Sequence, residues 1–226
     1  MRNRIMRDLI GLDLDSVLAN TEVALDKYLC EELGVFLDWD NDVYQYKIEE
    51  LPIITPDQKS KIQHLIHSGA LFKDIYPYNY AEHATKKLKN EGFDVAIITS
   101  RDQHLRTMTI DWLDKYDIKY DMLYMVPSIE KHAVIRDLGV KSFVEDRFDI
   151  LEIIMDRCGV LDYGLYIINH PWNKRNHHEQ IIRVDDIAQA VDKIIGYRKW
   201  LGYFTNKCQG NIEKFIKEYR DGKGTL

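Results

Sequence analysis

The sequence predicts an α/β protein in which a doubly wound, Rossmann-like parallel sheet carries a small helical cap inserted after its first strand. Three observations support this fold class. Short, continuously apolar runs end in polar residues, segments of helical period separate these runs, and residues 19–78 interrupt the alternation after the first run. Strands that alternate with helices are typical of right-handed βαβ units, which build a parallel sheet with helices on both faces.

The apolar runs are the predicted strands. They hold three to five residues each and show no polar alternation, which is typical of strands buried on both faces. A run at 122–126 is weaker than the others, and the other four end in Asp13, Thr99-Ser100, Glu145-Asp146 and Asn169-His170. These four runs cover residues 9–12, 95–98, 142–144 and 165–168.

Helical spacing of apolar residues predicts the elements between these strands, at residues 80–91, 104–116, 130–138 and 150–157. Ligands of such sheets bind beyond the carboxyl ends of the strands. We therefore expect the polar residues that end the strands to converge on one site.

The long interruption predicts a cap. Residues 19–78 are too many for a strand-to-helix connection, and helical patterns occur within them at 21–33 and 56–67. We expect a core of residues 1–18 and 79–195, a cap of residues 19–78, and a C-terminal helical tail of residues 196–226. Helices expected at 185–203 and 211–219 would pack on the sheet or on a second chain, so the sequence leaves the oligomeric state open.

Composition excludes several classes of protein. The 226 residues are 45% hydrophobic and 30% charged, with a mean hydropathy of −0.38, as in a water-soluble globular protein. The net charge of −6 is spread along the chain, with no basic stripe for nucleic acid. No uncharged apolar run approaches the roughly 20 residues that cross a bilayer. Three separated cysteines without a CxxC favour a reducing, cytoplasmic location and no structural zinc.

Asp13 and Asp15 form the most informative motif. Two carboxylates at the end of a buried strand are costly unless a cation meets them, and Mg²⁺ is commonly held by carboxylates together with a substrate phosphate. A helix N-cap would explain one Asp but explains two poorly. The sequence therefore predicts a Mg²⁺ site that binds a phosphorylated substrate.

The segment resembles the first motif, hhhhDxDxV, of the haloacid dehalogenase superfamily of phosphotransferases. Three further motifs of that superfamily have counterparts in the expected order, and together they cover residues 8 to about 150. The counterparts are Ile97-Ile98-Thr99-Ser100, Lys131 and Val144-Glu145-Asp146. Within the superfamily, the chain is similar to deoxyribonucleotidase-like and to bacterial or phage nucleotidase-like members. It departs from the common pattern at Ser16, where Gly is usual, and at Glu145, where Asp is usual.

The resemblance implies a mechanism and a set of roles. Asp13 would attack phosphorus and form an aspartyl-phosphate, and Asp15 would protonate the leaving alcohol and then activate water. Thr99, Ser100 and Lys131 would hold the phosphoryl oxygens. The Mg²⁺ ligands would be Asp13, the backbone carbonyl of Asp15, and Glu145 or Asp146, a choice that stays open.

Several residues have competing interpretations. Lys131 opens a helix, where a cation is unfavourable unless an anion is present, whereas Lys141 lies at the far end of its strand. We interpret His170, His177 and His178 as part of an exposed polar loop rather than as metal ligands, and Asp149 as a helix-capping residue as readily as a ligand.

Substrate contacts are the least determined by the sequence. Arg101, Trp172 and Asn173 are candidates, although Pro171-Trp172-Asn173 is equally well explained as a packed turn. In the cap, an aromatic side chain would stack on a base; the candidates are Trp39, Tyr44, Tyr46, Phe72, Tyr76 and Tyr78.

The leading functional hypothesis is a Mg²⁺-dependent phosphomonoester hydrolase of the 5′-nucleotidase type. Its substrate would be a small phosphorylated molecule such as a nucleoside monophosphate. The alternatives are the same chemistry on a sugar phosphate or on a polynucleotide 3′-phosphate, and a catalytically silent protein that binds a phosphorylated ligand.

Overall fold

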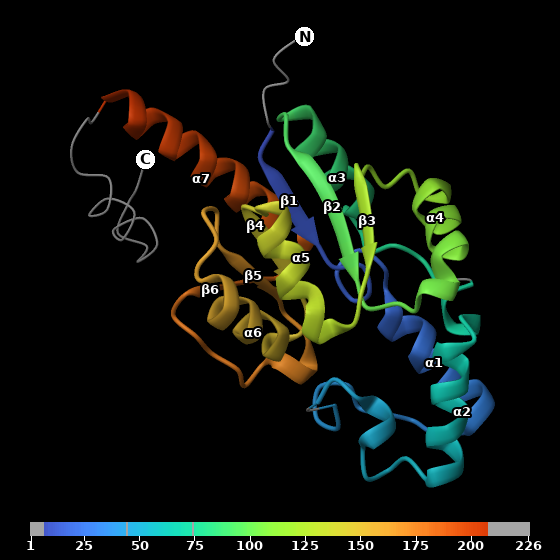
Figure 1. Cartoon of the computed structure of the whole chain (residues 1–226). Coiled ribbons are helices and arrows are strands. Elements are labelled where there is room, and N and C mark those ends of the chain that lie inside the picture. The colour runs from blue at the N-terminus through green and yellow to red at the C-terminus, as the bar shows by residue number, and fades with distance from the viewer. Residues whose placement is uncertain (1–6, 44, 74, 208–226) are drawn as a thin grey trace.

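The computed structural model describes residues 7–43, 45–73 and 75–207. A sheet of six parallel strands, in the order β3-β2-β1-β4-β5-β6, forms its centre (Figure 1). The predicted fold class and all five predicted strands are confirmed. The strands are β1 (Leu9–Leu12), β2 (Asp94–Thr99), β3 (Met122–Met125), β4 (Ser142–Glu145), β5 (Leu165–Ile168) and β6 (Ile181–Val184).

The strand missing from the sequence-based prediction is β6, at the edge of the sheet. Its two end residues are buried and its two middle residues, Ile182 and Arg183, are only partly buried. The Arg183 guanidinium donates to the side-chain oxygens of Asn169 and Asn173. An edge strand with a charged residue at its centre lacks the continuous apolar run by which the other strands were predicted.

The helices lie close to the predicted segments. Both cap helices have the predicted bounds, while α4 begins two residues later than expected because a 3₁₀ turn, Gln103–Leu105, precedes it, and α6 begins two residues earlier. The helices are α1 (Thr21–Leu33), α2 (Pro56–His67), α3 (Ala81–Asn90), α4 (Arg106–Lys115), α5 (Lys131–Leu138), α6 (Phe148–Cys158) and α7 (Ile187–Lys207).

Capping interactions explain the boundaries of the cap helices. The Asn20 side chain accepts a hydrogen bond from the Val23 amide at the start of α1, and Gly34 ends this helix in the left-handed conformation at φ 62°. Thr55 and Gln58 form a reciprocal capping box at the start of α2.

Two apolar layers enclose the sheet. One face packs against α5 and α6 through residues such as Ile135 and Leu151, together with Phe143 of β4. The other face packs against α3, α4 and α7 through residues such as Leu88 and Ile194. The sheet is therefore covered on both sides, which explains why its central strands are apolar throughout.

The C-terminal part of the described chain belongs to the second of these layers. Helix α7 runs without a break from residue 187 to residue 207, so the expected core–tail boundary at residue 195 falls within one helix. Tyr197 and Trp200, beyond that boundary, are buried. The helix expected at 211–219 lies outside the described residues. Within the described part of the chain, no helix is both long and apolar enough to cross a membrane.

The cap lies beyond the carboxyl ends of the strands (Figure 1). Besides α1 and α2 it contains the 3₁₀ turns η1 (Ile48–Glu50) and η2 (Ala70–Phe72). The chain enters and leaves the cap side by side, since the Asn20 amide donates to the Tyr76 carbonyl at 2.9 Å and the Tyr78 amide to the Leu18 carbonyl at 2.8 Å. These paired crossings support the proposed division of the chain at residues 18/19 and 78/79.

Candidate active site

Asp13 follows β1, the strand at which the strand order of the sheet reverses: β2 and β3 are added on one side of it, and β4, β5 and β6 on the other. β1 pairs with β2 on one edge and with β4 on the other, and chain connections diverge from this point. The Asp13 amide donates to the Val144 carbonyl of β4 at 2.9 Å, which fixes the residue at the end of the strand. Thr99 at the end of β2 and Glu145 at the end of β4 reach the same edge, as expected for a ligand site in a doubly wound fold.

Lys131 joins two of these strand ends. Its Nζ donates to Asp13 Oδ1 at 2.7 Å and to Glu145 Oε2 at 2.7 Å. All three side chains are buried, and Lys131 is the first residue of α5. The competing Lys141 pairs instead with the exposed Asp162. The structure therefore places Lys131, and not Lys141, among the carboxylates.

The site holds more negative charge than its lysine can neutralise. Asp13, Glu145 and Asp146 are buried, and each offers an oxygen that lies within 4.8 Å of the others'. Burial and the neighbouring Glu145 raise the pKa of Asp13 to about 7, and the same two causes raise the pKa of Asp146. Burial also acts against ionised Glu145, but Lys131, the Asp146 side chain and the Arg147 amide outweigh it and lower the pKa of this residue.

The two adjacent acids differ in what surrounds them. Both carboxylate oxygens of Glu145 accept hydrogen bonds. Its Oε1 accepts from the Asp146 and Arg147 amides, and its Oε2 accepts from Lys131. Asp146 Oδ2 is buried and, among the described residues, has no hydrogen-bond partner. A divalent cation with oxygen ligands would satisfy this atom and neutralise the excess charge, so the donor set fits Mg²⁺.

Asp15 is engaged by other groups. Arg101 donates from Nε to Asp15 Oδ2 at 2.8 Å and from Nη2 to Oδ1 at 2.7 Å, and Thr21 Oγ1 donates to the same Oδ1 at 3.0 Å. The sequence makes Arg101 a candidate for contacting the substrate; in the structure both of its side-chain hydrogen bonds go to Asp15. The ion pair joins residues 86 positions apart, and no local pattern indicates it.

Thr99 and Ser100 differ in accessibility. Thr99 is buried, and its Oγ1 accepts from the Arg101 amide at 3.3 Å. Ser100 is exposed and its hydroxyl lies 2.8 Å from that of Ser128, which also accepts from Arg147 Nη1. Thr99 thus faces the buried part of the site and Ser100 its rim.

The turn η5 (Pro171–Asn173) supports the acidic loop after β4. Asn173 Nδ2 donates to the carbonyls of Asp146 and Ile168, both at 2.8 Å, and Trp172 Nε1 donates to the Asp146 carbonyl at 3.2 Å. Both side chains are buried. The packed-turn interpretation therefore accounts for Asn173, whereas Trp172 also lines a cavity described below.

His170 differs from the exposed loop residue that the sequence suggested, because it is buried. Its ring stacks on Trp172 with 4.4 Å between centroids, Nδ1 lies 2.7 Å from Glu22 Oε1, and Nε2 lies 2.8 Å from the Ser16 carbonyl. Both ring nitrogens therefore face oxygen atoms of residues close to Asp13 and to the start of the cap. His177 is exposed and His178 half-buried, as a loop position predicts.

Ser16 is the residue at which the chain departs from the first motif that it resembles. Its φ is 59°, in the left-handed region that Gly adopts without steric cost. The Ser16 amide donates to the Ala19 carbonyl at 2.8 Å, and its own carbonyl faces His170. These two contacts hold a conformation that the side chain disfavours.

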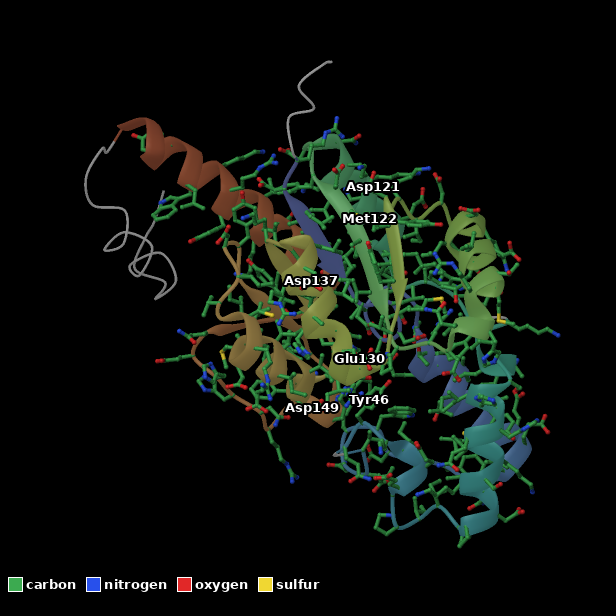
Figure 2. The ribbon with its side chains drawn as sticks, viewed as in Figure 1. Tyr46, Asp121, Met122, Glu130, Asp137 and Asp149 are labelled. Atoms are coloured by element: carbon green, nitrogen blue, oxygen red, sulfur yellow. The ribbon has the colours of Figure 1, made fainter. Side chains whose placement is uncertain are left out.

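A cavity of about 290 Å³ separates the cap from the core at Asp15 and Ser100. Trp39, Tyr46 and Phe72 line it from the cap and Trp172 from the core. Tyr46 meets Trp172 edge-on at 6.0 Å, and the Arg147 guanidinium lies 4.6 Å from its ring. Figure 2 shows Tyr46 of the cap next to Asp149 of the core, and both residues line a neighbouring pocket.

The other aromatic candidates are placed differently. Neither Tyr76 nor Tyr78 lines this cavity. Tyr76 is exposed, and the Tyr78 hydroxyl donates a hydrogen bond to Glu22. Tyr44 lies outside the described residues. Asp149, also considered as a metal ligand, is exposed and pairs with Arg147.

A second group of possible metal ligands was not expected from the sequence. His67 at the end of α2 lies with Asp102 and His104 of the core, and one ligand atom from each falls within 4.8 Å of the others. All three are exposed, and His67 Nδ1 lies 2.9 Å from Asp102 Oδ2. The group of Asp13, Glu145 and Asp146 is the better candidate for a metal site. Its members are buried, and it contains Asp146 Oδ2, which has no hydrogen-bond partner among the described residues.

In sheet order and in the place of its cap, the chain has the fold of solved hydrolases of the haloacid dehalogenase superfamily. Among solved structures, a haloacid dehalogenase-like hydrolase from Xanthomonas campestris aligns with a TM-score of 0.54 at 12% identity, covering 87% of this chain and 98% of the other. A superfamily hydrolase from Geobacter sulfurreducens aligns with a TM-score of 0.52 at 16% identity, covering 83% and 96%.

The chain belongs to the family described as 5′ nucleotidase, deoxy (Pyrimidine), cytosolic type C protein, whose model matches residues 7–200. The nucleotidase-like protein YqfW of Bacillus subtilis is 24% identical over 188 residues, covering 80% of this chain and 91% of the relative. A nucleotidase of Clostridium acetobutylicum is 22% identical over 200 residues, covering 82% and 94%. The protein is accordingly a phosphoric monoester hydrolase of nucleotidase character.

Proposed function

We propose that the protein is a Mg²⁺-dependent nucleoside monophosphate phosphatase that acts through an aspartyl-phosphate intermediate. The observation that carries this proposal is the buried group of Asp13, Glu145 and Asp146 around a single lysine. Such a group retains negative charge that a metal ion would neutralise, and one of its carboxylates, Asp13, follows the central strand, where it would act as the nucleophile.

In the first step, an Asp13 oxygen attacks phosphorus and the bond between phosphorus and the alcohol oxygen breaks. Asp15 gives its proton to that oxygen, so the alcohol leaves neutral. In the second step, water attacks the phosphorus of the aspartyl-phosphate while Asp15 takes up its proton. The bond between phosphorus and Asp13 then breaks, and phosphate leaves.

Lys131 and Thr99 are proposed to hold the phosphoryl oxygens, by charge and by hydrogen bond respectively, with Ser100 contributing from the rim. Mg²⁺ would be held by Asp13, the Asp15 carbonyl and Asp146, with Glu145 fixing Lys131 rather than binding the ion directly. We assign Asp146 because its Oδ2 has no partner in the described structure, whereas both Glu145 oxygens are occupied. When bound, the ion would neutralise charge on the phosphoryl oxygens.

Mg²⁺ should stabilise the protein more at pH 8 than at pH 5.5. The pKa of Asp13 is about 7 in the folded, metal-free protein and about 4 in an unfolded chain. Between these values the folded state retains a proton that the unfolded state has lost, so metal-free stability falls as the pH rises. Mg²⁺ competes with that proton and gains affinity over the same interval. Thermal unfolding with Mg²⁺ or with chelator at both pH values measures the difference.

The matched controls for this experiment are Asp146→Asn and the exposed Asp156→Asn on α6. We expect the first variant to lose most of the Mg²⁺-dependent rise in the unfolding temperature and the second to retain it. An equal rise at the two pH values, or an undiminished rise in Asp146→Asn, would contradict the proposed metal site.

Substrate selection is proposed to reside in the cavity between cap and core. Tyr46 and Trp39 are the cap aromatics with the best access to a base, because Phe72 already covers Arg101. Tyr46→Ala should raise KM for nucleoside monophosphates roughly 5- to 100-fold, the loss of one base-stacking contact. Hydrolysis of p-nitrophenyl phosphate should change little. Tyr76→Ala, outside the cavity, is the control; equal losses for both substrates in Tyr46→Ala would mean that Tyr46 only stabilises the cap.

A phosphate-release screen tests the function as a whole. Its substrates are deoxyribonucleoside and ribonucleoside monophosphates, sugar phosphates and an oligonucleotide with a 3′-phosphate, each with Mg²⁺ and with chelator. We expect the highest kcat/KM among the nucleoside monophosphates. A preference for either of the other classes would overturn the substrate assignment, and no release from any ester would indicate a silent phospho-ligand-binding protein.

A further inference from the structure

Arg101 is a buried cation that the roles above leave without a function. Its side chain is 1% exposed, and its Cζ lies 4.1 Å from the centre of the Phe72 ring. Two of its nitrogens donate to the two oxygens of Asp15, while the third, Nη1, has no partner in the described structure. Every side-chain hydrogen bond that fixes this guanidinium therefore goes to Asp15.

We propose that Arg101 is a positioning residue that acts through Asp15 and ties the orientation of this acid–base group to the cap. The inference rests on the proposed function and extends it to a residue outside the set that touches the phosphoryl group.

The geometry of the pair supports a positioning role. A planar guanidinium that donates to both oxygens of a carboxylate fixes the rotation of the carboxylate as well as its distance, which a lysine cannot do. Asp15 is only partly buried, with its side chain 16% exposed, so without this pair its carboxylate could turn toward the cavity. Proton transfer to a leaving oxygen depends on such orientation.

Two segments of the cap contact the pair formed by Asp15 and Arg101. Thr21, the first residue of α1, donates directly to Asp15 Oδ1, and Phe72, the last residue of η2, covers the guanidinium that holds the same carboxylate. The cap's position over the cavity and the orientation of Asp15 are thus linked by contacts on two sides.

Leaving-group dependence distinguishes this role from others. Arg101→Met, which keeps an apolar contact with Phe72, should lower kcat for phenyl phosphate roughly 10- to 100-fold, and kcat for p-nitrophenyl phosphate by less than about threefold. The better leaving group needs little protonation, so it is insensitive to the orientation of Asp15. Arg101→Lys should fall between Arg101→Met and the wild type.

A double-mutant cycle with Asp15→Asn makes the test specific. If Arg101 acts through Asp15, adding Arg101→Met to Asp15→Asn should cause no further loss with phenyl phosphate. Additive losses, or a rise in KM without a change in the leaving-group ratio, would mean that Arg101 contacts the substrate itself and would overturn the proposal.

The matched control is Arg198→Met. Arg198 also stacks on a phenylalanine, with its Cζ 3.7 Å from the centre of the Phe93 ring, but it donates to the Glu91 carbonyl just before β2, at the opposite end of the sheet from the site. We expect its leaving-group ratio to equal that of the wild type. An equal loss with both esters in Arg101→Met, together with a lower unfolding temperature, would indicate a purely structural tie and also overturn the proposal.

The link to the cap has its own variant. Phe72→Leu should change the ratio of kcat values in the same direction as Arg101→Met, by a smaller factor, and an unchanged ratio would overturn the link.

Hydrolysis of both esters by the wild-type protein is measured first. Its absence would contradict the proposed function, whereas an active wild type with an additive cycle would contradict only the role of Arg101.

Discussion

Asp13→Asn should reduce turnover by about 10⁴-fold or more, because the variant lacks the carboxylate that would form the covalent intermediate. The loss should be as large with p-nitrophenyl phosphate as with a nucleoside monophosphate, since every substrate passes through the same aspartyl-phosphate. Steady-state hydrolysis in the presence of Mg²⁺ measures it.

The fold should survive this change. Asn keeps the shape of Asp, and it removes one negative charge from a buried group that holds three carboxylates and one lysine. We therefore expect the metal-free variant to unfold at a temperature no lower than that of the wild type. Asp8→Asn, which alters an acid just before the opposite end of β1, is the control and should retain activity. If Asp13→Asn kept a tenth of the wild-type rate, Asp13 could not be the nucleophile.

Lys131→Met should destabilise the metal-free protein by about 3–5 kcal/mol, the usual effect of removing one partner from a buried ion pair. The side chains of Asp13 and Glu145 are 7% and 0% exposed, so water cannot replace the lost ammonium. The destabilisation should shrink at pH 5, where protonation of Asp13 relieves the repulsion between the two acids. Urea unfolding at pH 5 and pH 8 measures both effects.

The comparison for Lys131 is Lys141→Met. Lys141 forms an ion pair of the same 2.7 Å length with Asp162, but that pair is exposed and its loss should cost less than about 1 kcal/mol. Equal losses in the two variants would show that burial of the Lys131 cluster contributes nothing. Mg²⁺ should restore part of the stability of Lys131→Met, because it supplies positive charge to the same carboxylates.

Local patterns account for what could be predicted about the fold. The runs at β1 and β5 are apolar throughout, and the capping residues Thr55 and Gln58 mark the start of α2 within four residues of sequence. Such features involve residues that are close together along the chain, so they can be recognised in a single sequence. β6 escaped prediction because Arg183 stabilises an edge strand by contacts with distant residues rather than by burial.

The site was predictable to the extent that its residues end strands. Asp13, Thr99, Glu145 and Asp146 follow from this rule, and Lys131 from its place at the start of a helix. The contacts of Arg101 with Asp15 and of His170 with the Ser16 carbonyl join residues that are 86 and 154 positions apart. Tertiary packing decides these contacts, and no periodicity in the sequence reports them.

The central place of β1 bears on how the chain is made. β1 is synthesised before the other strands of this sheet, and it pairs through Gly11 with Ala96 on one side and with Phe143 on the other. Its second edge therefore stays open until synthesis has passed β4, and during that interval its apolar residues are available to wrong partners. The same stretch of chain delivers Glu145 and Asp146, so a nascent chain gains the second neighbour of β1 and its full set of buried acids at one moment. A chain that stops short of β4 would lack both.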